Sequence, residues 1–164
     1  ATTGQETWAY RNIAGWKKAL PHLKTVMGGP HPSFDYGVLK DAEYIDAITK
    51  GEAEYAMLDL INAWEAGRSI EGIPNVGHLK DGEPYMTPIR PVIQDLDTLP
   101  FPDVDIFYKY PFLASKRVMQ VHASRGCQNS CTYCSVGLMK KEWISGKKGE
   151  KFNRTKSVDY LCEE

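Results

Sequence analysis

The sequence predicts an α/β fold built from three consecutive regions. In residues 1–70, helical and extended patterns alternate, which is typical of a parallel sheet covered by helices. Residues 71–115 contain a hairpin signal, and seven of the ten prolines lie between positions 74 and 111. Residues 116–164 begin with an extended run that leads into three closely spaced cysteines. We therefore expect part of a doubly wound, flavodoxin- or Rossmann-like domain, a proline-rich linker with a β-hairpin, and a strand–loop–helix unit.

The first region is expected to start and end with a helix. Thr2 or Thr3 can cap the first helix, and Pro21 ends it. Gly67 is the expected C-cap of the last helix. Apolar residues at helical spacing define both: Ala9, Ile13, Trp16 and Leu20 in the first, and Met57, Ile61 and Trp64 in the last. The elements after the first helix are a strand at 24–27, a short helix at 36–41, a strand at 44–49 and a helix at 52–66.

The second and third regions show a clear turn signal and fewer regular patterns. Asp81-Gly82 lies between extended runs at 76–80 and 83–87, which predicts a β-hairpin. After it we expect a proline-braced linker at 88–112, a strand at 118–123 and a helix that begins at Ser157.

Composition and charge exclude several classes of protein. Of the 164 residues, 42% are hydrophobic and 25% charged, which is typical of a globular chain and not of a disordered or collagen-like one. A net charge of -1 removes the usual electrostatic case for binding nucleic acid or an anionic membrane. The local run of lysines (140, 141, 147, 148 and 151) is interpreted as a solvated loop, with a phosphate or nucleic-acid contact as the alternative. No apolar run approaches the roughly 18 residues of a membrane span, and no signal peptide is evident.

Three of the four cysteines form one cluster. Cys127, Cys131 and Cys134 follow a C-x3-C-x2-C spacing, whereas a disulfide-rich secreted module would scatter its cysteines. Iron–sulfur clusters are normally held by cysteine thiolates. Three thiolates on one loop can hold three irons of a cubane cluster and leave the fourth iron open to another ligand. The clustering also favours a reducing cytoplasm.

The spacing of these cysteines resembles the signature of the radical SAM superfamily. Tyr133 stands directly before the last cysteine, and an extended run ending in Ser-Arg-Gly (124–126) precedes the first. The resemblance implies a [4Fe-4S] cluster on Cys127, Cys131 and Cys134, with Tyr133 near the cluster and S-adenosylmethionine. It further implies reductive cleavage of S-adenosylmethionine to a 5'-deoxyadenosyl radical, and that residues 116–164 are the start of a (β/α) barrel, at whose C-terminal face active sites lie.

A structural zinc site is the alternative interpretation of the cluster. Cys162 or His122 would then be the fourth ligand. Structural zinc sites usually show two C-x2-C pairs, and this sequence has one. In the radical SAM interpretation Cys162 is expected to be a buried thiol on a helix.

A glycine pair follows the first expected strand. The segment Gly28-Gly29-Pro30-His31-Pro32 can continue neither a strand nor a helix. Open α/β sheets bind ligands at the carboxyl ends of their strands, where glycines let a large ligand approach the main chain. Taken alone, the segment also fits a plain turn.

The order of several motifs resembles the cobalamin-binding domain that precedes many radical SAM cores. Residues 26–34 are similar to its glycine loop, and residues 50–54 to its Gly-Glu-Gly-Glu turn, with Ala53 in place of the second glycine. Residues 2–4 fall where the Ser/Thr-rich loop of that family is expected, and residues 95–102 resemble its interdomain linker. The resemblance implies that cobalamin is bound by Thr3, Gly28, Gly29, Gly51 and Glu52. We assign His31 to shaping the site and not to ligating cobalt.

The combined resemblance implies a cobalamin-dependent radical SAM enzyme. Its expected chemistry is methyl transfer to carbon or phosphorus with cobalamin as the methyl carrier, or a related radical rearrangement or cyclisation. It also implies a small-molecule substrate and a reducing electron donor such as flavodoxin or ferredoxin. The chain opens without methionine and closes within an expected helix, so we interpret it as a fragment and expect no turnover from it alone. The competing hypothesis is a non-catalytic, zinc-binding α/β interaction module.

Overall fold

The computed structural model describes residues 2–42, 44–115, 121–144 and 149–164. The chain forms two compact units, residues 1–92 and residues 93–164, and each is described by itself. Within the described residues, no helix is both long and apolar enough to cross a bilayer.

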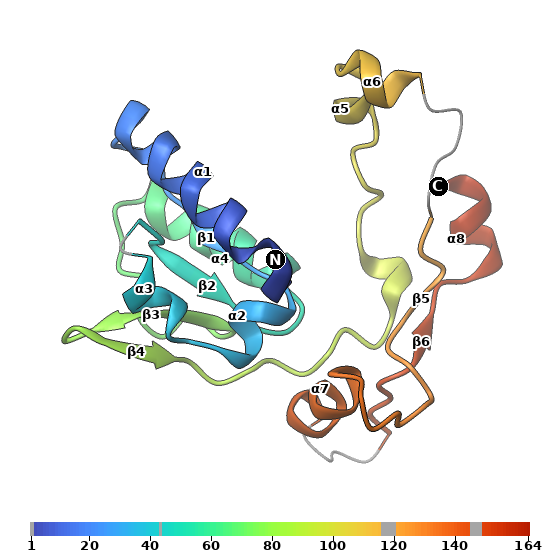
Figure 1. Cartoon of the computed structure of the whole chain (residues 1–164). Coiled ribbons are helices and arrows are strands. Elements are labelled where there is room, and N and C mark those ends of the chain that lie inside the picture. The colour runs from blue at the N-terminus through green and yellow to red at the C-terminus, as the bar shows by residue number, and fades with distance from the viewer. Residues whose placement is uncertain (1, 43, 116–120, 145–148) are drawn as a thin grey trace. The chain divides into compact units, whose positions relative to one another are not determined.

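The first unit is built on a four-stranded mixed sheet (Figure 1). Its strands, in spatial order, are β1 (Val26–Met27), β2 (Ala47–Thr49), β3 (Val76–Lys80) and β4 (Glu83–Met86). The β1 and β2 strands run parallel, as the alternating pattern predicts. The β3 strand pairs antiparallel with both β2 and β4, so the hairpin, which the sequence analysis places in the linker region, makes the sheet mixed.

The predicted hairpin is confirmed, but it extends this sheet. Asp81 and Gly82 have φ values of 53° and 81°, the left-handed pair that a tight two-residue hairpin turn requires. The buried half of β3 places Val76 opposite Thr49 of β2. The hairpin therefore belongs to the first unit because pairing with β2 satisfies its backbone and buries its apolar end.

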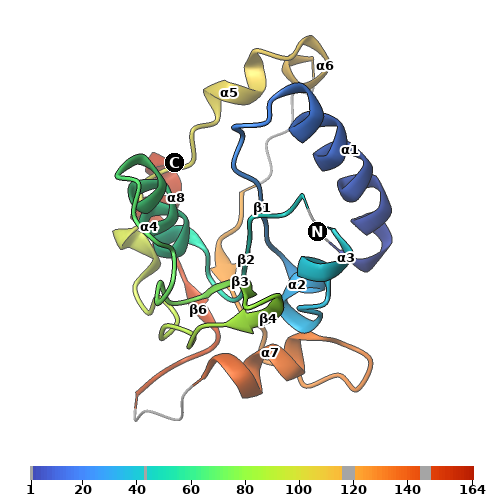
Figure 2. The same ribbon diagram turned by 90° about the vertical axis from the view of Figure 1, so that its left-hand side faces the viewer.

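Helices cover both faces of the β1–β2 pair (Figure 2). One core packs Ile13 of α1 (Glu6–Ala19) and Leu39 of α3 (Val38–Asp41) with Ile48 of β2. The other packs Leu60 of α4 (Glu54–Glu65) with Val76. The helices form where the periodicity predicts and give a layered α/β/α arrangement. The predicted buried face of α4 is wrong in detail, because α4 buries Ala56, Leu60 and Ala63 whereas Ile61 is 45% exposed.

The bounds of the elements differ slightly from prediction. A 3-10 turn, Thr3–Gln5, precedes α1, and the Gln5 side chain accepts a hydrogen bond from the Thr2 amide at 3.2 Å. The β1 and β2 strands keep only the last residues of the predicted runs. A short helix that the sequence pattern did not predict, α2 (Pro30–Phe34), follows the glycine pair. Proline is favoured at the first position of a helix because its missing amide hydrogen has no partner there.

The second unit consists of short elements. They are the 3-10 turn η2 (Leu96–Thr98), α5 (Asp105–Tyr108), α6 (Pro111–Ala114), β5 (Ser124–Arg125), α7 (Val136–Trp143), β6 (Arg154–Thr155) and α8 (Val158–Glu163). Residues 118–120 of the predicted strand lie outside the described residues, residues 121–123 are not a strand, and the observed strand begins at Ser124. The final helix is confirmed, with the Ser157 hydroxyl accepting a hydrogen bond from the Tyr160 amide at 3.1 Å.

The pairing in this unit differs from that of a barrel. Strands β5 and β6 pair antiparallel, with Arg125 opposite Arg154. Consecutive strands of a (β/α) barrel run parallel. The predicted strand–loop–helix is present as β5, the cysteine loop and α7, and its place at the start of a barrel stays a prediction.

Candidate cofactor sites

The glycine pair lies at the carboxyl edge of the β1–β2 pair. Gly28 follows β1 directly, and a Cβ atom built on it would lie 2.7 Å from Oγ1 of Thr49. Gly29 has a φ of 99°, a conformation that favours glycine, and begins α2. The Ser33 hydroxyl donates to the Gly29 carbonyl at 2.8 Å. These contacts require a small residue at Gly28 and hold the loop against the end of β2.

The loop after β2 reaches the same edge. Lys50 is buried, its amine donates a hydrogen bond to the Tyr36 hydroxyl, and its Nζ lies 5.0 Å from the centre of the Tyr36 ring. Gly51 has a φ of 84°, and Glu52 beside it is half-buried. Because β1 and β2 are parallel, both loops emerge at one edge. The structure thus brings Gly28, Gly29, Gly51 and Glu52 to the edge that the sequence analysis selected.

The start of α1 packs beside this edge. Glu6 Oε2 lies 3.2 Å from Nε2 of His31 in α2, and the Tyr10 hydroxyl lies 3.3 Å from the same nitrogen. Burial, followed by the charge of Glu6, raises the pKa of Tyr10. The His31 side chain is only 9% exposed, which fits the shaping role assigned to it. The side chain of Thr3, the remaining predicted cobalamin residue, lies outside the described part of the structure.

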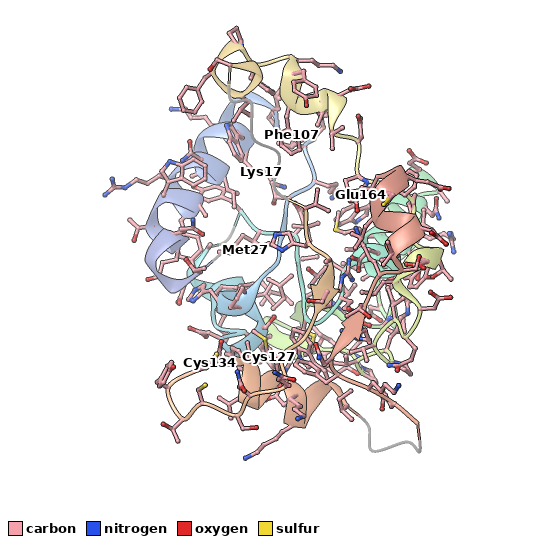
Figure 3. All side chains as sticks on the ribbon, turned by 90° about the vertical axis from the view of Figure 1, so that its right-hand side faces the viewer. Lys17, Met27, Phe107, Cys127, Cys134 and Glu164 are labelled. Carbon is pink, nitrogen blue, oxygen red and sulfur yellow. The ribbon has the colours of Figure 1, made fainter. Side chains whose placement is uncertain are left out.

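The three clustered cysteines lie on the loop from β5 into α7, where Figure 3 labels Cys127 and Cys134. Cys127 and Cys134 are half-buried and Cys131 is exposed. The Cys134 amide donates to the Cys131 carbonyl at 3.2 Å, which forms a tight turn. Tyr133, within that turn, is 91% exposed.

The cysteine loop does not present a preformed metal site. Among the described residues, no group of three or more histidine, cysteine, aspartate or glutamate side chains could hold a metal ion. This applies equally to the zinc alternative with Cys162 or His122. The expectation that Cys162 is buried is wrong, since it is exposed on α8. The last helix is short, and its exposed face carries this thiol.

One structural residue at these sites, Asn75, escaped the sequence analysis. Asn75, at the start of β3, is 1% exposed and bonds to the loop after β2. Arg154 is 6% exposed, and its guanidinium donates to the carbonyls of Ile93 at 2.7 Å and Phe152 at 3.1 Å. The sequence signal for Asn75 was its place directly before an extended run, because asparagine tolerates a positive φ better than most residues.

Comparison with known proteins gives a consistent picture. No protein-family model matches the chain. It is 39% identical over 137 residues to the anaerobic magnesium-protoporphyrin IX monomethyl ester cyclase of Rubrivivax gelatinosus, covering 77% of this chain and 24% of that protein. It is 33% identical over 149 residues to the uncharacterized methyltransferase PH0819 of Pyrococcus horikoshii, covering 87% of this chain and 32% of that protein.

More distant matches involve a further methyltransferase and a solved structure. The chain is 25% identical over 149 residues to the cytidylyl-2-hydroxyethylphosphonate methyltransferase of Streptomyces wedmorensis, covering 71% of this chain and 28% of that protein. It also matches the structure of the cobalamin-dependent S-adenosylmethionine radical enzyme OxsB with a TM-score of 0.66 and 21% identity. That match covers 98% of this chain and 21% of the other, and it shows a shared fold.

The sequence analysis predicts a resemblance to the cobalamin-binding radical SAM proteins, from the glycine loops at one sheet edge and the three-cysteine loop. The matches confirm this predicted resemblance, and they show that the chain is homologous to part of the magnesium-protoporphyrin monomethyl ester cyclases. The chain spans between about a fifth and a third of the length of these relatives.

Proposed function

We propose that the protein of which this chain forms part is a cobalamin-dependent radical SAM enzyme. The observation that carries the proposal is the convergence of two glycine loops at the carboxyl edge of parallel strands in the first unit. The three-cysteine loop in the second unit supports it. In this proposal the reaction takes place in the reducing cytoplasm, because the cluster thiolates must stay reduced.

The residues present fit both groups chemically. Gly29 and Gly51 have positive φ, so the main chain turns at both positions at the sheet edge to which we assign cobalamin. We assign Thr3, Gly28, Gly29, Gly51 and Glu52 to cobalamin. The assigned [4Fe-4S] ligands are Cys127, Cys131 and Cys134, with Tyr133 beside the cluster and S-adenosylmethionine.

The chemistry that these groups supply when bound is a 5'-deoxyadenosyl radical and a carried methyl group. The chain's own residues bind and orient them. Exposure of Cys131 leaves the thiol accessible for cluster assembly, and the loop must close around the cluster as it forms. We propose a small-molecule substrate and an electron donor such as flavodoxin or ferredoxin.

Two reaction classes follow from the relatives. Methyl transfer to carbon or phosphorus is the first, because two of the relatives are named as methyltransferases. A radical cyclisation is the second, because the relative with 39% identity is named as a cyclase. Methyl-labelled S-adenosylmethionine separates them in the full-length protein. Label in the product indicates methyl transfer, whereas an unmethylated product accompanied by 5'-deoxyadenosine indicates cyclisation.

Anaerobic reconstitution with iron and sulfide tests the cluster. The reconstituted chain should be brown, and the electron paramagnetic resonance spectrum of its reduced form should change when S-adenosylmethionine is added. Cys131→Ala should abolish assembly, whereas Cys162→Ala, which removes an exposed cysteine outside the motif, should leave it unchanged. A colourless chain with one tightly bound zinc would instead identify the non-catalytic interaction module.

A further inference from the structure

Asn75 occupies an unusual place at the end of the sheet. It is 1% exposed and has a φ of 69°, within the left-handed region. Thr49 pairs with Val76, so the next residues along the ladder are Lys50 and Asn75. The Lys50 amide donates to the Asn75 carbonyl at 2.9 Å, as the antiparallel ladder requires. The sheet therefore continues one pair beyond the last assigned residues of β2.

The side chain of Asn75 replaces a missing backbone hydrogen bond in this pair. The Asn75 amide hydrogen points to the Pro88 carbonyl, at 3.0 Å, and not to β2. The side-chain nitrogen Nδ2 donates to the Lys50 carbonyl at 2.7 Å in its place. One residue thus bonds to β2 and to the segment after β4 at the same time.

The other half of the amide anchors that second segment. Asn75 Oδ1 accepts a hydrogen bond from the Arg90 backbone amide at 2.9 Å. Gly51 lies directly against the side-chain amide of Asn75, since a Cβ built on Gly51 would be 2.9 Å from Asn75 Nδ2 and 3.4 Å from Cγ2 of Ile89. The side-chain amide of Asn75 therefore helps to hold the loop that contains Gly51 and Glu52.

Asparagine combines the three properties that this position demands. It tolerates a left-handed backbone, donates from Nδ2 and accepts at Oδ1. The bond to Lys50 is buried and the bond to Arg90 is partly buried, so the loss of either leaves a polar group without its partner. Glycine at position 75 would keep the left-handed backbone conformation but would remove both side-chain hydrogen bonds of Asn75.

We propose that Asn75 is a positioning residue for the cobalamin-binding edge, acting through the loop 50–52 and not through contact with the cofactor. This inference rests on the proposed function. Asn75 positions Gly51 and Glu52 through its hydrogen bond to the Lys50 carbonyl, while Tyr36 holds the side chain of Lys50.

The test is Asn75→Gly in the chain described here, read out in two independent ways. Amide hydrogen exchange at Arg90, which loses its acceptor Oδ1, should accelerate by about tenfold or more, because one hydrogen bond worth about 1.4 kcal/mol changes an opening equilibrium tenfold. The dissociation constant for hydroxocobalamin, measured by spectroscopic titration, should rise by a similar factor. Asn75→Asp keeps the acceptor for Arg90 but removes the donor to Lys50, so it should restore protection at Arg90 alone.

Ile13→Ala is the matched control. It destabilises the α1 core, on the opposite face of the sheet from α4, and should lower the melting temperature while leaving the cobalamin affinity unchanged. If Asn75→Gly leaves exchange or cobalamin affinity at the wild-type value, the positioning role is wrong. If the wild-type chain does not bind hydroxocobalamin, the proposed function fails, and the exchange measurement still decides whether Asn75 holds the loop.

Discussion

The backbone of Gly126 lies against Phe152 so closely that a Cβ atom on Gly126 would be 2.0 Å from the Phe152 carbonyl oxygen. Gly126 also has a φ of 85°, in the left-handed region. It is the last residue before Cys127 and follows the β5 strand, which pairs with β6. This contact therefore sets the point at which the cysteine loop leaves the sheet.

Gly126→Ala should displace the start of the cysteine loop. The left-handed backbone alone costs a residue with a Cβ about 1–2 kcal/mol, and the contact with a backbone carbonyl adds to that because the carbonyl cannot move away freely. We expect lower thermal stability of the second unit and loss of iron after anaerobic reconstitution. Gly137→Ala is the control, because a Cβ there meets nothing within 4 Å and alanine favours the α7 helix. Equal iron content in both variants would contradict the prediction.

Asp46 links the end of α1 to the start of β1 and makes stability depend on pH. It accepts hydrogen bonds from Lys17 Nζ at 2.6 Å and from the Thr25 amide at 2.8 Å. Burial alone would raise the pKa of Asp46, but the hydrogen bonds from Lys17 and Thr25 and the Lys17 charge lower it below its ordinary value. The bonds therefore stabilise the fold above the ordinary pKa of about 3.9, and this stability is lost as pH falls through the lowered value.

Asp46→Asn should reduce the free energy of unfolding by about 1–2 kcal/mol at pH 7, because charge-assisted hydrogen bonds are weakened. The difference from wild type should shrink below about pH 4, where the unfolded carboxyl is protonated. Urea denaturation at several pH values measures this difference in unfolding free energy. The exposed Asp103→Asn should show no such difference, and a pH-independent gap for Asp46→Asn would contradict the assignment.

Asp97 anchors the start of α8. The two oxygens of its carboxylate lie 3.0 and 3.2 Å from the Ser157 amide, and hydrogen bonds from the Ser157 side chain and amide lower the pKa of Asp97. In wild type, protection of the Ser157 amide from hydrogen exchange, corrected for intrinsic rates, should fall as pH drops through the lowered pKa. Asp97→Ala should remove this protection at every pH. Asp103→Ala serves as the comparison, and unchanged protection in Asp97→Ala would show that the anchor lies elsewhere.

Two leucines on α4 differ in burial and should differ in their effect on stability. Leu60 is 0% exposed and packs on the sheet, whereas Leu58 is 54% exposed. Leu60→Ala should cost about 2–5 kcal/mol of unfolding free energy through lost burial and cavity formation. Leu58→Ala should change it by less than about 0.5 kcal/mol. Denaturant titration of both variants compares them directly, and similar losses would mean that α4 is rotated.

Local sequence patterns were sufficient to predict several features of this protein. The presence of the α4 helix, the Asp81-Gly82 turn and the capping of α8 by Ser157 all depend on residues close together in the chain. The parallel pairing of β1 with β2 also followed from the helix between them. The glycine loops were therefore placed correctly at one edge, because parallel strands end on the same side.

Tertiary structure alone decided the features that depend on distant segments. No local pattern shows that β3 pairs with β2, that Asn75 completes this ladder, or that Phe152 lies against Gly126. Each depends on the register between stretches 25 or more residues apart. Local propensities determine which elements form, whereas burial and hydrogen bonding between distant elements determine how they pair. The sequence by itself therefore predicted which residues carry the chemistry, and the tertiary structure determined which residues hold them in place.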